Sequence, residues 1–186
     1  MNNYDLPTSL TIGEVVHPIR SGWRAVMDIF NAFNDPELDQ EDKTDIMIRI
    51  LYPKWREIPF RDMPEAIEKA CSFLDCGKSR EENRNRPRLV DWGLDSRIII
   101  PEINKVAKTE VRANPDMHWW TFFGWYMAIE GGLFGTVVHI RKKQTTGKKL
   151  DKWEEEFYRD NREMVDLPKV LSDEEKATQA YFDKWL

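Results

Sequence analysis

The residue types that usually perform catalysis or bind metals are few in this chain and lie far apart. His17, His118 and His139 are scattered along it, and its two cysteines, Cys71 and Cys76, are separated by five positions. Zinc sites favour cysteines two to four residues apart, and thiol redox sites favour the pattern CxxC. The patterns GxSxG, GxxxxGK[ST] and GxGxxG, typical of nucleophilic and phosphate-binding sites, do not occur. We therefore expect no catalytic site, no metal site and no cofactor.

One pair of carboxylates has the spacing of a shared helix face. Asp91 and Asp95 are one helical turn apart and could form an acid–base pair. Acidic residues at the start of a helix are also explained by their favourable interaction with the helix dipole. The second interpretation needs no active site, and the sequence supplies no nucleophile to support the first.

A basic stretch at residues 141–149 is the only credible sequence feature for nucleic-acid binding. Clustered Lys and Arg contribute a salt-sensitive affinity for phosphate backbones. Four acidic residues follow between positions 151 and 156, however, and the whole chain has a net charge of −5. We expect a solvated, flexible linker here. A nucleic-acid-associated protein that uses this stretch and the loop at 80–88 is kept as an alternative.

The most unusual feature is an aromatic segment, residues 118–126, with the sequence HWWTFFGWY. In a helix its large side chains point in all directions, so one apolar face cannot bury them all. Such a helix lies either at the centre of a bundle or partly exposed at a protein–protein interface, where Trp and Tyr often act as anchors. The candidate partner-binding residues of this segment are Trp119, Trp120, Phe123 and Trp125.

The periodicity of apolar residues predicts the elements that position these segments. Residues 10–12 and 15–19 are prone to form β-strands around a turn at Gly13 and Glu14. Helical spacing takes over from Trp23 onward. We expect helices at 23–33, at 39–52, at 64–77, from 91 onward, at 116–129, around 150–157 and at 172–185.

The same patterns predict which side chains face inward. Ile46, Ile50 and Leu51 mark the inner face of the second helix, and Leu94 marks that of the fourth, which Pro101 should kink or split. We expect the helix at 116–129 to be buried on all sides and to be followed by a glycine break and a short second element.

Length and composition indicate a mainly α protein. A chain of 186 residues fits one domain with an appendage, and 41% hydrophobic residues are enough for one core. The apolar stretch 117–140 could span a membrane, but Glu130 near its centre costs about 2.5–3.5 kcal/mol to insert. We expect a soluble, cytoplasmic protein without a secretory signal and with no membrane contact. Its helical-bundle core with a small N-terminal β-hairpin occupies residues 1–140, and a two-helix C-terminal extension occupies residues 141–186 after the basic linker.

The aromatic segment and the residues around it resemble a known family. The string His118-Trp119-Trp120-x-Phe122, followed by Gly132-Leu133 and Ile140-Arg141, is similar to the signature of the bacteriophage family named gene product fifteen. Met117 and Thr121 replace the leucine and lysine usual in that signature. The resemblance covers residues 4–142, and the further landmarks that agree with it are Leu6-Pro7, Ile12-Gly13, Arg24, Tyr52 and Asp91…Asp95…Ile98.

The resemblance implies a role in phage tail assembly. Members of the family are encoded beside the tape-measure gene, which implies a non-enzymatic tail assembly chaperone that binds the tape-measure protein. Capture of an amphipathic helix in a groove is the expected mechanism. In the C-terminal extension the expected contact residues are Trp153, Phe157, Tyr181 and Trp185.

Further partners and one competing function follow from the same resemblance. A second tail chaperone, a tail tube subunit and another copy of the chain are additional candidate partners. We expect the chain to act in the host cytoplasm during assembly and to be absent from the mature virion. A structural minor tail or connector subunit, which would stay in the virion, is the main alternative.

Overall fold

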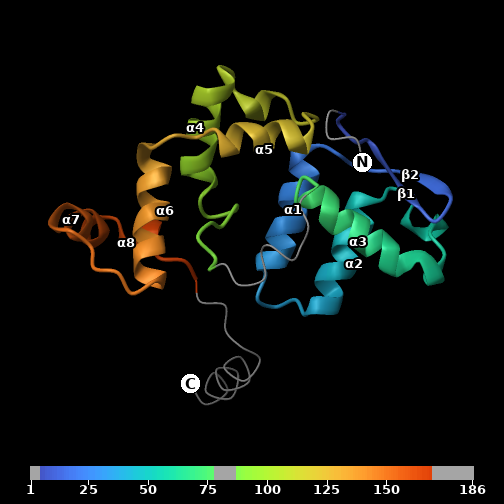
Figure 1. Ribbon diagram of the computed structural model, residues 1–186, viewed down its shortest axis with the longest axis horizontal. Helices are drawn as coiled ribbons and strands as arrows, with labels where there is room; N and C mark the ends of the chain where they lie inside the picture. The colour runs from blue at the N-terminus through green and yellow to red at the C-terminus, as the bar shows by residue number, and fades with distance from the viewer. Residues whose placement is uncertain (1–4, 78–86, 169–186) are drawn as a thin grey trace, which may run out of the picture.

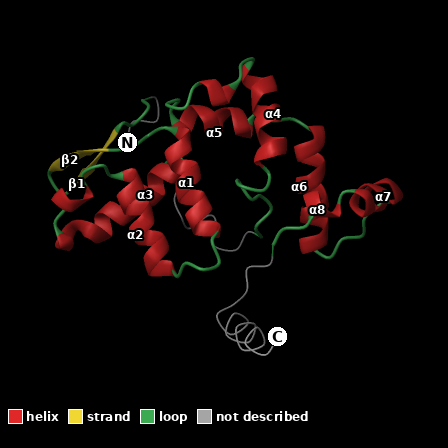
Figure 2. Cartoon of the chain, turned by 180° about the vertical axis from the view of Figure 1, so that it is seen from behind, coloured by secondary structure: helices red, strands yellow, loops and turns green. Residues whose placement is uncertain are grey.

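The computed structural model describes residues 5–77 and 87–168, and these fold into helices with one small β-hairpin (Figure 1). The hairpin and the first three helices lie at one end of the longest axis, the next two in the middle and the last three at the other end (Figure 2). The expected fold class is therefore confirmed. The expected helix at 172–185 and most of the expected loop at 78–88 lie outside the described residues.

The hairpin has the predicted position and turn. Strand β1 (Ser9–Ile12) pairs antiparallel with β2 (Val15–Pro18), with Ile12 opposite Val15. Gly13 in the turn has a φ of +58°, which a residue without a side chain adopts at little cost. Its backbone N–H donates a hydrogen bond of 2.8 Å to Glu65, so the tip of the hairpin is fixed to the third helix.

Three helices form the N-terminal part of the core: α1 (Trp23–Asn34), α2 (Gln40–Leu51) and α3 (Met63–Leu74). Asp39 caps α2 as predicted, because its side chain accepts a hydrogen bond of 2.8 Å from the backbone N–H of Asp42. Two short 3₁₀ turns, η1 (Trp55–Glu57) and η2 (Phe60–Asp62), connect α2 to α3. Helix α2 packs against both α1 and α3.

The predicted inner face of α2 is partly wrong. Met47, Ile48 and Leu51 are the buried side chains, whereas Ile46 and Ile50 are only half-buried. Because α2 contacts two helices, its buried face follows the spacing i, i+1, i+4 and is rotated from the single stripe that the sequence suggested.

Helix α4 (Ser96–Ala107) starts later than predicted and runs through Pro101 without a break. The carboxylate of Asp91 accepts hydrogen bonds from the backbone N–H groups of Gly93 (2.9 Å) and Leu94 (3.0 Å). Such local side-chain bonds compete with helix formation, so residues 92–95 form turns. Leu94 consequently points outward and is 50% exposed, which contradicts the predicted inward position.

Helix α5 (Trp119–Met127) is shorter and less buried than predicted. The backbone N–H of Trp23 donates to the carbonyl of Met117 (2.9 Å), and the N–H of Trp119 donates to that of Ser21 (2.7 Å). This extended pairing keeps residues 117 and 118 out of the helix. The expectation of burial on all sides is wrong, because Met127 near the end of the helix is 59% exposed.

The last three helices are α6 (Gly132–Thr145), α7 (Lys152–Asp160) and α8 (Arg162–Val165). The flexible linker expected at 141–149 is wrong for its first five residues, which continue α6. The basic side chains there have structural partners: Lys143 contacts both oxygens of Glu154 at 2.6 Å. Nothing in the fold tests the proposed division of the chain at residue 140, which stays a prediction.

A buried ion pair joins α6 to the turn before α4. Both terminal nitrogens of Arg141 donate to the carboxylate of Asp95, at 2.7 and 2.9 Å, and both side chains are nearly inaccessible to solvent. Arg141 also donates to the carbonyls of Leu89, Met164 and Val165. All five N–H groups of this guanidinium are therefore satisfied, as burial of a charge requires.

Candidate partner-binding cavity

The aromatic segment first holds the scaffold together. His118 caps α5, because its Nδ1 accepts a hydrogen bond of 3.0 Å from the backbone N–H of Trp120. Its Nε2 lies 2.9 Å from the carbonyl of Pro7 and must carry the proton to donate there. The neutral imidazole thus connects the N-terminal arm to α5.

The two tryptophans that follow close the C-terminal end of α3. The indole N–H of Trp119 donates to the carbonyl of Leu74, and that of Trp120 donates to the carbonyl of Phe73, both at 2.9 Å. The last carbonyls of a helix have no partner within the helix. The Trp119 bond satisfies the carbonyl of Leu74, and the Trp120 bond adds to the one that the carbonyl of Phe73 accepts from the backbone N–H of Cys76 at 3.1 Å. Trp119 is completely buried, whereas Trp120 is half-buried.

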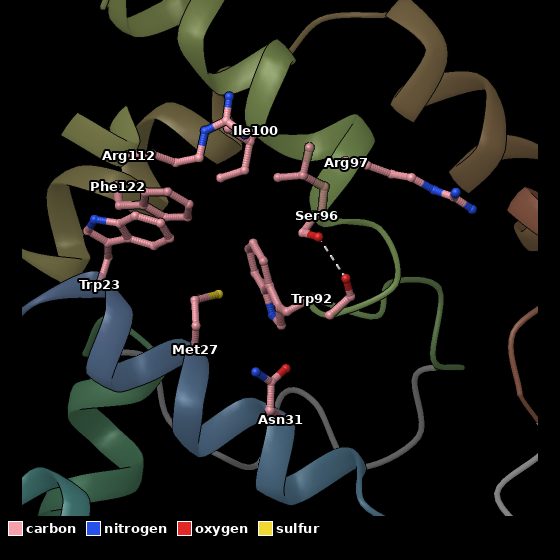
Figure 3. A pocket seen from close by; sticks show the side chains of 11 residues that line it. Trp23, Met27, Asn31, Trp92, Ser96, Arg97, Ile100, Arg112 and Phe122 are labelled. Carbon is pink, nitrogen blue, oxygen red and sulfur yellow. Dashed lines mark hydrogen bonds between the residues drawn. The ribbon is translucent and has the colours of Figure 1, made fainter. Parts of the chain in front are cut away.

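A cavity of about 480 Å³ opens between α1, the turn before α4, and α5. Figure 3 shows its apolar walls, in which the stacked rings of Trp23 and Phe122 face Met27, Trp92 and Ile100. The centroids of Trp23 and Phe122 are 4.6 Å apart, and their planes differ by only 3°. The cavity has about three times the volume of a ~150 Å³ cavity that holds benzene. It can therefore accept more than one large apolar side chain of a partner.

The opening of the cavity is polar. Asn31, Ser96 and Arg112 are exposed there, and the hydroxyl of Ser96 donates to the carbonyl of Gly93 at 2.8 Å. Apolar walls with a few polar groups at the opening are typical of binding sites in proteins. We refer to this site, with its apolar walls and its polar opening, as the α1–α4–α5 cavity.

Arg112 at this opening is held in place by Glu110. Its Nε and Nη2 donate to the two carboxylate oxygens at 2.8 and 2.9 Å. These hydrogen bonds lower the pKa of Glu110 to about 2, and they raise the pKa of Arg112. The backbone is fixed as well, because Arg24 donates to the carbonyl of Arg112 and the indole of Trp23 donates to that of Asn114. The opening is therefore preorganised.

None of the sequence-predicted contact residues that the structure describes lines this cavity. Phe123 and Trp125 are half-buried on α5, and the ring of Phe123 packs 5.2 Å from that of Trp119. Trp153 is 59% exposed on α7, with the half-buried Phe157 ring 5.6 Å away. The remaining predicted contact residues, Tyr181 and Trp185, lie outside the described residues.

The sequence does not distinguish the residues that line the cavity from ordinary core or turn residues. Trp23 and Met27 belong to the apolar stripe of the first helix, and such a stripe does not reveal that part of it borders a cavity. Trp92 lies in a turn and has no periodicity at all. A tryptophan in a charged, non-periodic stretch is the one sequence feature that could have indicated a residue of the cavity.

No cluster of three or more His, Cys, Asp or Glu side chains within 5–77 and 87–168 is arranged to hold a metal ion. None of the helices in that part of the chain combines the length and apolar character needed to cross a membrane.

A family model described as "Bacteriophage Gp15 protein" matches residues 3–167 of the chain. Neither the curated proteins nor the solved structures contain a significant match.

Proposed function

The chain belongs to the bacteriophage Gp15 protein family, and we propose that it is a tail assembly chaperone that binds the tape-measure protein. In this proposal it has no catalytic activity and leaves before the virion matures. It holds apolar helical segments of the tape-measure protein until the tail tube encloses them.

The α1–α4–α5 cavity is the observation that carries the proposal. A partner helix presents side chains at i and i+3 or i+4 about 5–6 Å apart, so two neighbouring anchors can enter one cavity of about 480 Å³. Helix-in-groove binding uses an apolar groove, and the walls of this cavity include the half-buried ring of Trp92 beside the buried rings of Trp23 and Phe122.

The expected strength of this contact suits a chaperone. Burial of one Leu or Phe contributes roughly 1.5–3 kcal/mol, so two anchors contribute about 3–6 kcal/mol before the entropic cost of association. One cavity therefore gives weak, reversible binding, and a long partner with repeated segments can be held by several copies of the chain and still be released.

The exposed Trp153 and its neighbour Phe157 form a second candidate contact surface. They lie on α7, at the end of the molecule opposite the hairpin (Figure 1). Nucleic-acid binding through the basic stretch has less support, because Arg141 is buried against Asp95 and Lys143 contacts Glu154.

Co-expression with the product of the neighbouring tape-measure gene tests the proposal. We expect the tape-measure protein to become soluble and to co-purify with the wild-type chain. Ser96→Trp, which places a large ring at the opening of the cavity, should reduce co-purification at least tenfold. Asp28→Trp, at an exposed position of α1 outside the cavity, is the matched control and should retain it.

Two results would contradict the proposal. An insoluble tape-measure protein, together with the chain itself in purified virions, would favour the minor tail or connector subunit. Equal co-purification by the Ser96→Trp and wild-type chains would remove the cavity from the binding surface.

A further inference from the structure

Arg97 connects the α1–α4–α5 cavity to a second hollow of about 470 Å³. Its stem lines the cavity, whereas Figure 3 shows its guanidinium pointing away from it. The rest of the second hollow, here named the arginine hollow, is formed by residues 159–164 at the turn from α7 to α8. Arg97 thus borders both spaces.

Two cations of the arginine hollow lack an acidic partner within the described part of the chain. Arg97 forms no ion pair with residues 5–77 or 87–168. The guanidinium of Arg162 lies 5.3 Å from the ring centre of Tyr158 and likewise contacts no described carboxylate. Arg159, by contrast, is already paired with Asp160 at 3.1 Å. Glu163 also lines the hollow, so its three arginines and two carboxylates leave a formal charge of +1, and it can accept added negative charge.

The described chain ends beside this hollow. Met164 lines the arginine hollow, and Val165 to Leu167 line an adjacent one together with Arg88 and Arg141. Residues 169–186 follow directly after Pro168 and lie beyond the part matched by the family model. They therefore begin five residues after Met164.

The sequence of residues 169–186 contains the groups that would suit these two spaces, acidic side chains first and aromatic side chains after them. Three carboxylates, at positions 173, 174 and 175, come first, and the large apolar side chains of Tyr181, Phe182 and Trp185 follow. Pro168 follows Met164 of the arginine hollow by four residues, and Arg97 connects that hollow to the α1–α4–α5 cavity.

The chain is long enough for this path. An extended chain covers up to about 3.4 Å per residue, so the stretch from Pro168 to Tyr181 reaches up to about 45 Å. A folded chain of 186 residues has a radius of gyration of only about 16 Å. A tethered segment also acts at an effective concentration in the millimolar range, which favours contacts too weak to form between separate molecules.

We propose that residues 169–186 occupy the α1–α4–α5 cavity of their own chain when no partner is bound. The carboxylates of Asp173, Glu174 and Glu175 neutralise Arg97 and Arg162, and the aromatic side chains at 181 and 185 enter the cavity. A partner helix must displace this segment before it binds. This last step alone rests on the proposed function, whereas occupancy of the cavity does not.

Photo-cross-linking in the full-length chain, without any partner, tests the occupancy. Trp185 is replaced by p-benzoylphenylalanine, whose excited ketone inserts into nearby C–H bonds and reacts well with methionine. We expect a cross-link within one molecule that maps to the cavity walls, with Met27 as the main site. In the Ser96→Trp background, with its opening filled, this product should fall at least fivefold.

Two controls test whether the cross-link from position 185 is specific. The same probe at Trp153, which is exposed on α7, should give no product with Met27. Reversal of charge in Glu174→Lys combined with Glu175→Lys should lower the yield from position 185 severalfold. Cross-links that join two molecules, or that map away from α1, α4 and α5, would overturn the inference.

The outcome is independent of the tape-measure experiment. A cross-link to Met27 without tape-measure binding would support self-occupancy and reject the chaperone. If the cross-link forms and the chain also binds the tape-measure protein, Tyr181→Ser combined with Trp185→Ser should raise the apparent affinity for that protein severalfold. The reason is that the cavity is then occupied by its own chain in a smaller fraction of molecules. An unchanged affinity would show that the segment does not compete.

Discussion

Asp95 and Arg141, 46 residues apart in sequence, form a doubly hydrogen-bonded ion pair in the interior of the protein. The pair joins the turn before α4 to α6, and Arg141 extends the connection to α8 through the carbonyls of Met164 and Val165. One side chain thus fixes three segments whose order in the chain does not make them neighbours.

This pair should dominate the stability of the C-terminal half. Asp95→Asn leaves the Arg141 charge buried without its partner, and we expect it to lower the free energy of unfolding by about 3–5 kcal/mol in urea denaturation. The matched control is Asp45→Asn, which breaks the exposed Asp45–Arg49 pair and should cost less than about 1 kcal/mol. Equal losses in the two variants would contradict the structural role of the buried pair.

The same pair limits what truncation can show. A chain that ends at residue 140 lacks Arg141 and the α8 carbonyls that it binds. We expect such a chain to lose cooperative unfolding in calorimetry, so loss of partner binding there would not locate the binding surface. A core that melts cooperatively at the wild-type temperature would show instead that residues 1–140 fold alone.

Attachment of α7 should depend on pH through Glu154. Hydrogen bonds from Lys143 lower the pKa of Glu154, aided by the backbone N–H of Asp151 and by His139, whose Nε2 is 3.1 Å from the carboxylate. Because the pKa is lower in the folded state, the stabilisation is complete above the unfolded value of about 4.5 and disappears as the pH falls through the folded value.

The measurement for Glu154 compares thermal unfolding of the wild-type and Glu154→Gln chains, followed by tryptophan fluorescence. The variant should melt at a lower temperature near pH 6, and the difference should shrink as the pH decreases below 4.5. Glu155→Gln, an exposed neighbour on α7, is the control and should show no such convergence. If the difference in melting temperature grew on acidification, Glu154 would not be the source of the pH dependence.

Trp120 should contribute to stability through its hydrogen bond as well as its ring. In Trp120→Phe the carbonyl of Phe73 loses the indole donor but keeps the 3.1 Å bond from the backbone N–H of Cys76, and we expect a loss of about 1 kcal/mol in urea unfolding. Trp153→Phe is the control, because this exposed ring makes no hydrogen bond to another described residue; its change should stay within about 0.5 kcal/mol. A larger loss of stability in Trp153→Phe than in Trp120→Phe would contradict the structural role of Trp120.

Gly132 at the start of α6 should be intolerant of a side chain. Its φ is +70°, and an added Cβ would lie 2.8 Å from a carboxylate oxygen of Glu102. We expect Gly132→Ala to destabilise the fold by about 1–2 kcal/mol from the left-handed conformation alone. Gly135→Ala, in the same helix with open space at its Cβ, should instead be neutral or stabilise by up to about 1 kcal/mol in calorimetry. Similar effects in both variants would contradict the backbone argument.

Local chemistry in the sequence was sufficient to predict many elements. The hairpin with Gly13 in its turn and the cap of α2 at Asp39 are both decided by neighbouring residues, because turn geometry and helix capping act over a few positions. The residues His118, Trp119 and Trp120 were also recognised as the centre of a family signature, and the family match confirms that membership.

Only the tertiary structure decided what the distinctive residues do. Trp119 and Trp120 complete the end of α3, a helix about 45 positions earlier, and Arg141 meets Asp95 instead of starting a flexible linker. The cavity likewise combines Trp23, Trp92 and Phe122 from three separate segments. Periodicity reports which face of one helix is apolar, but cavities and buried ion pairs depend on which segments meet in space, and that is determined by packing between distant parts of the chain.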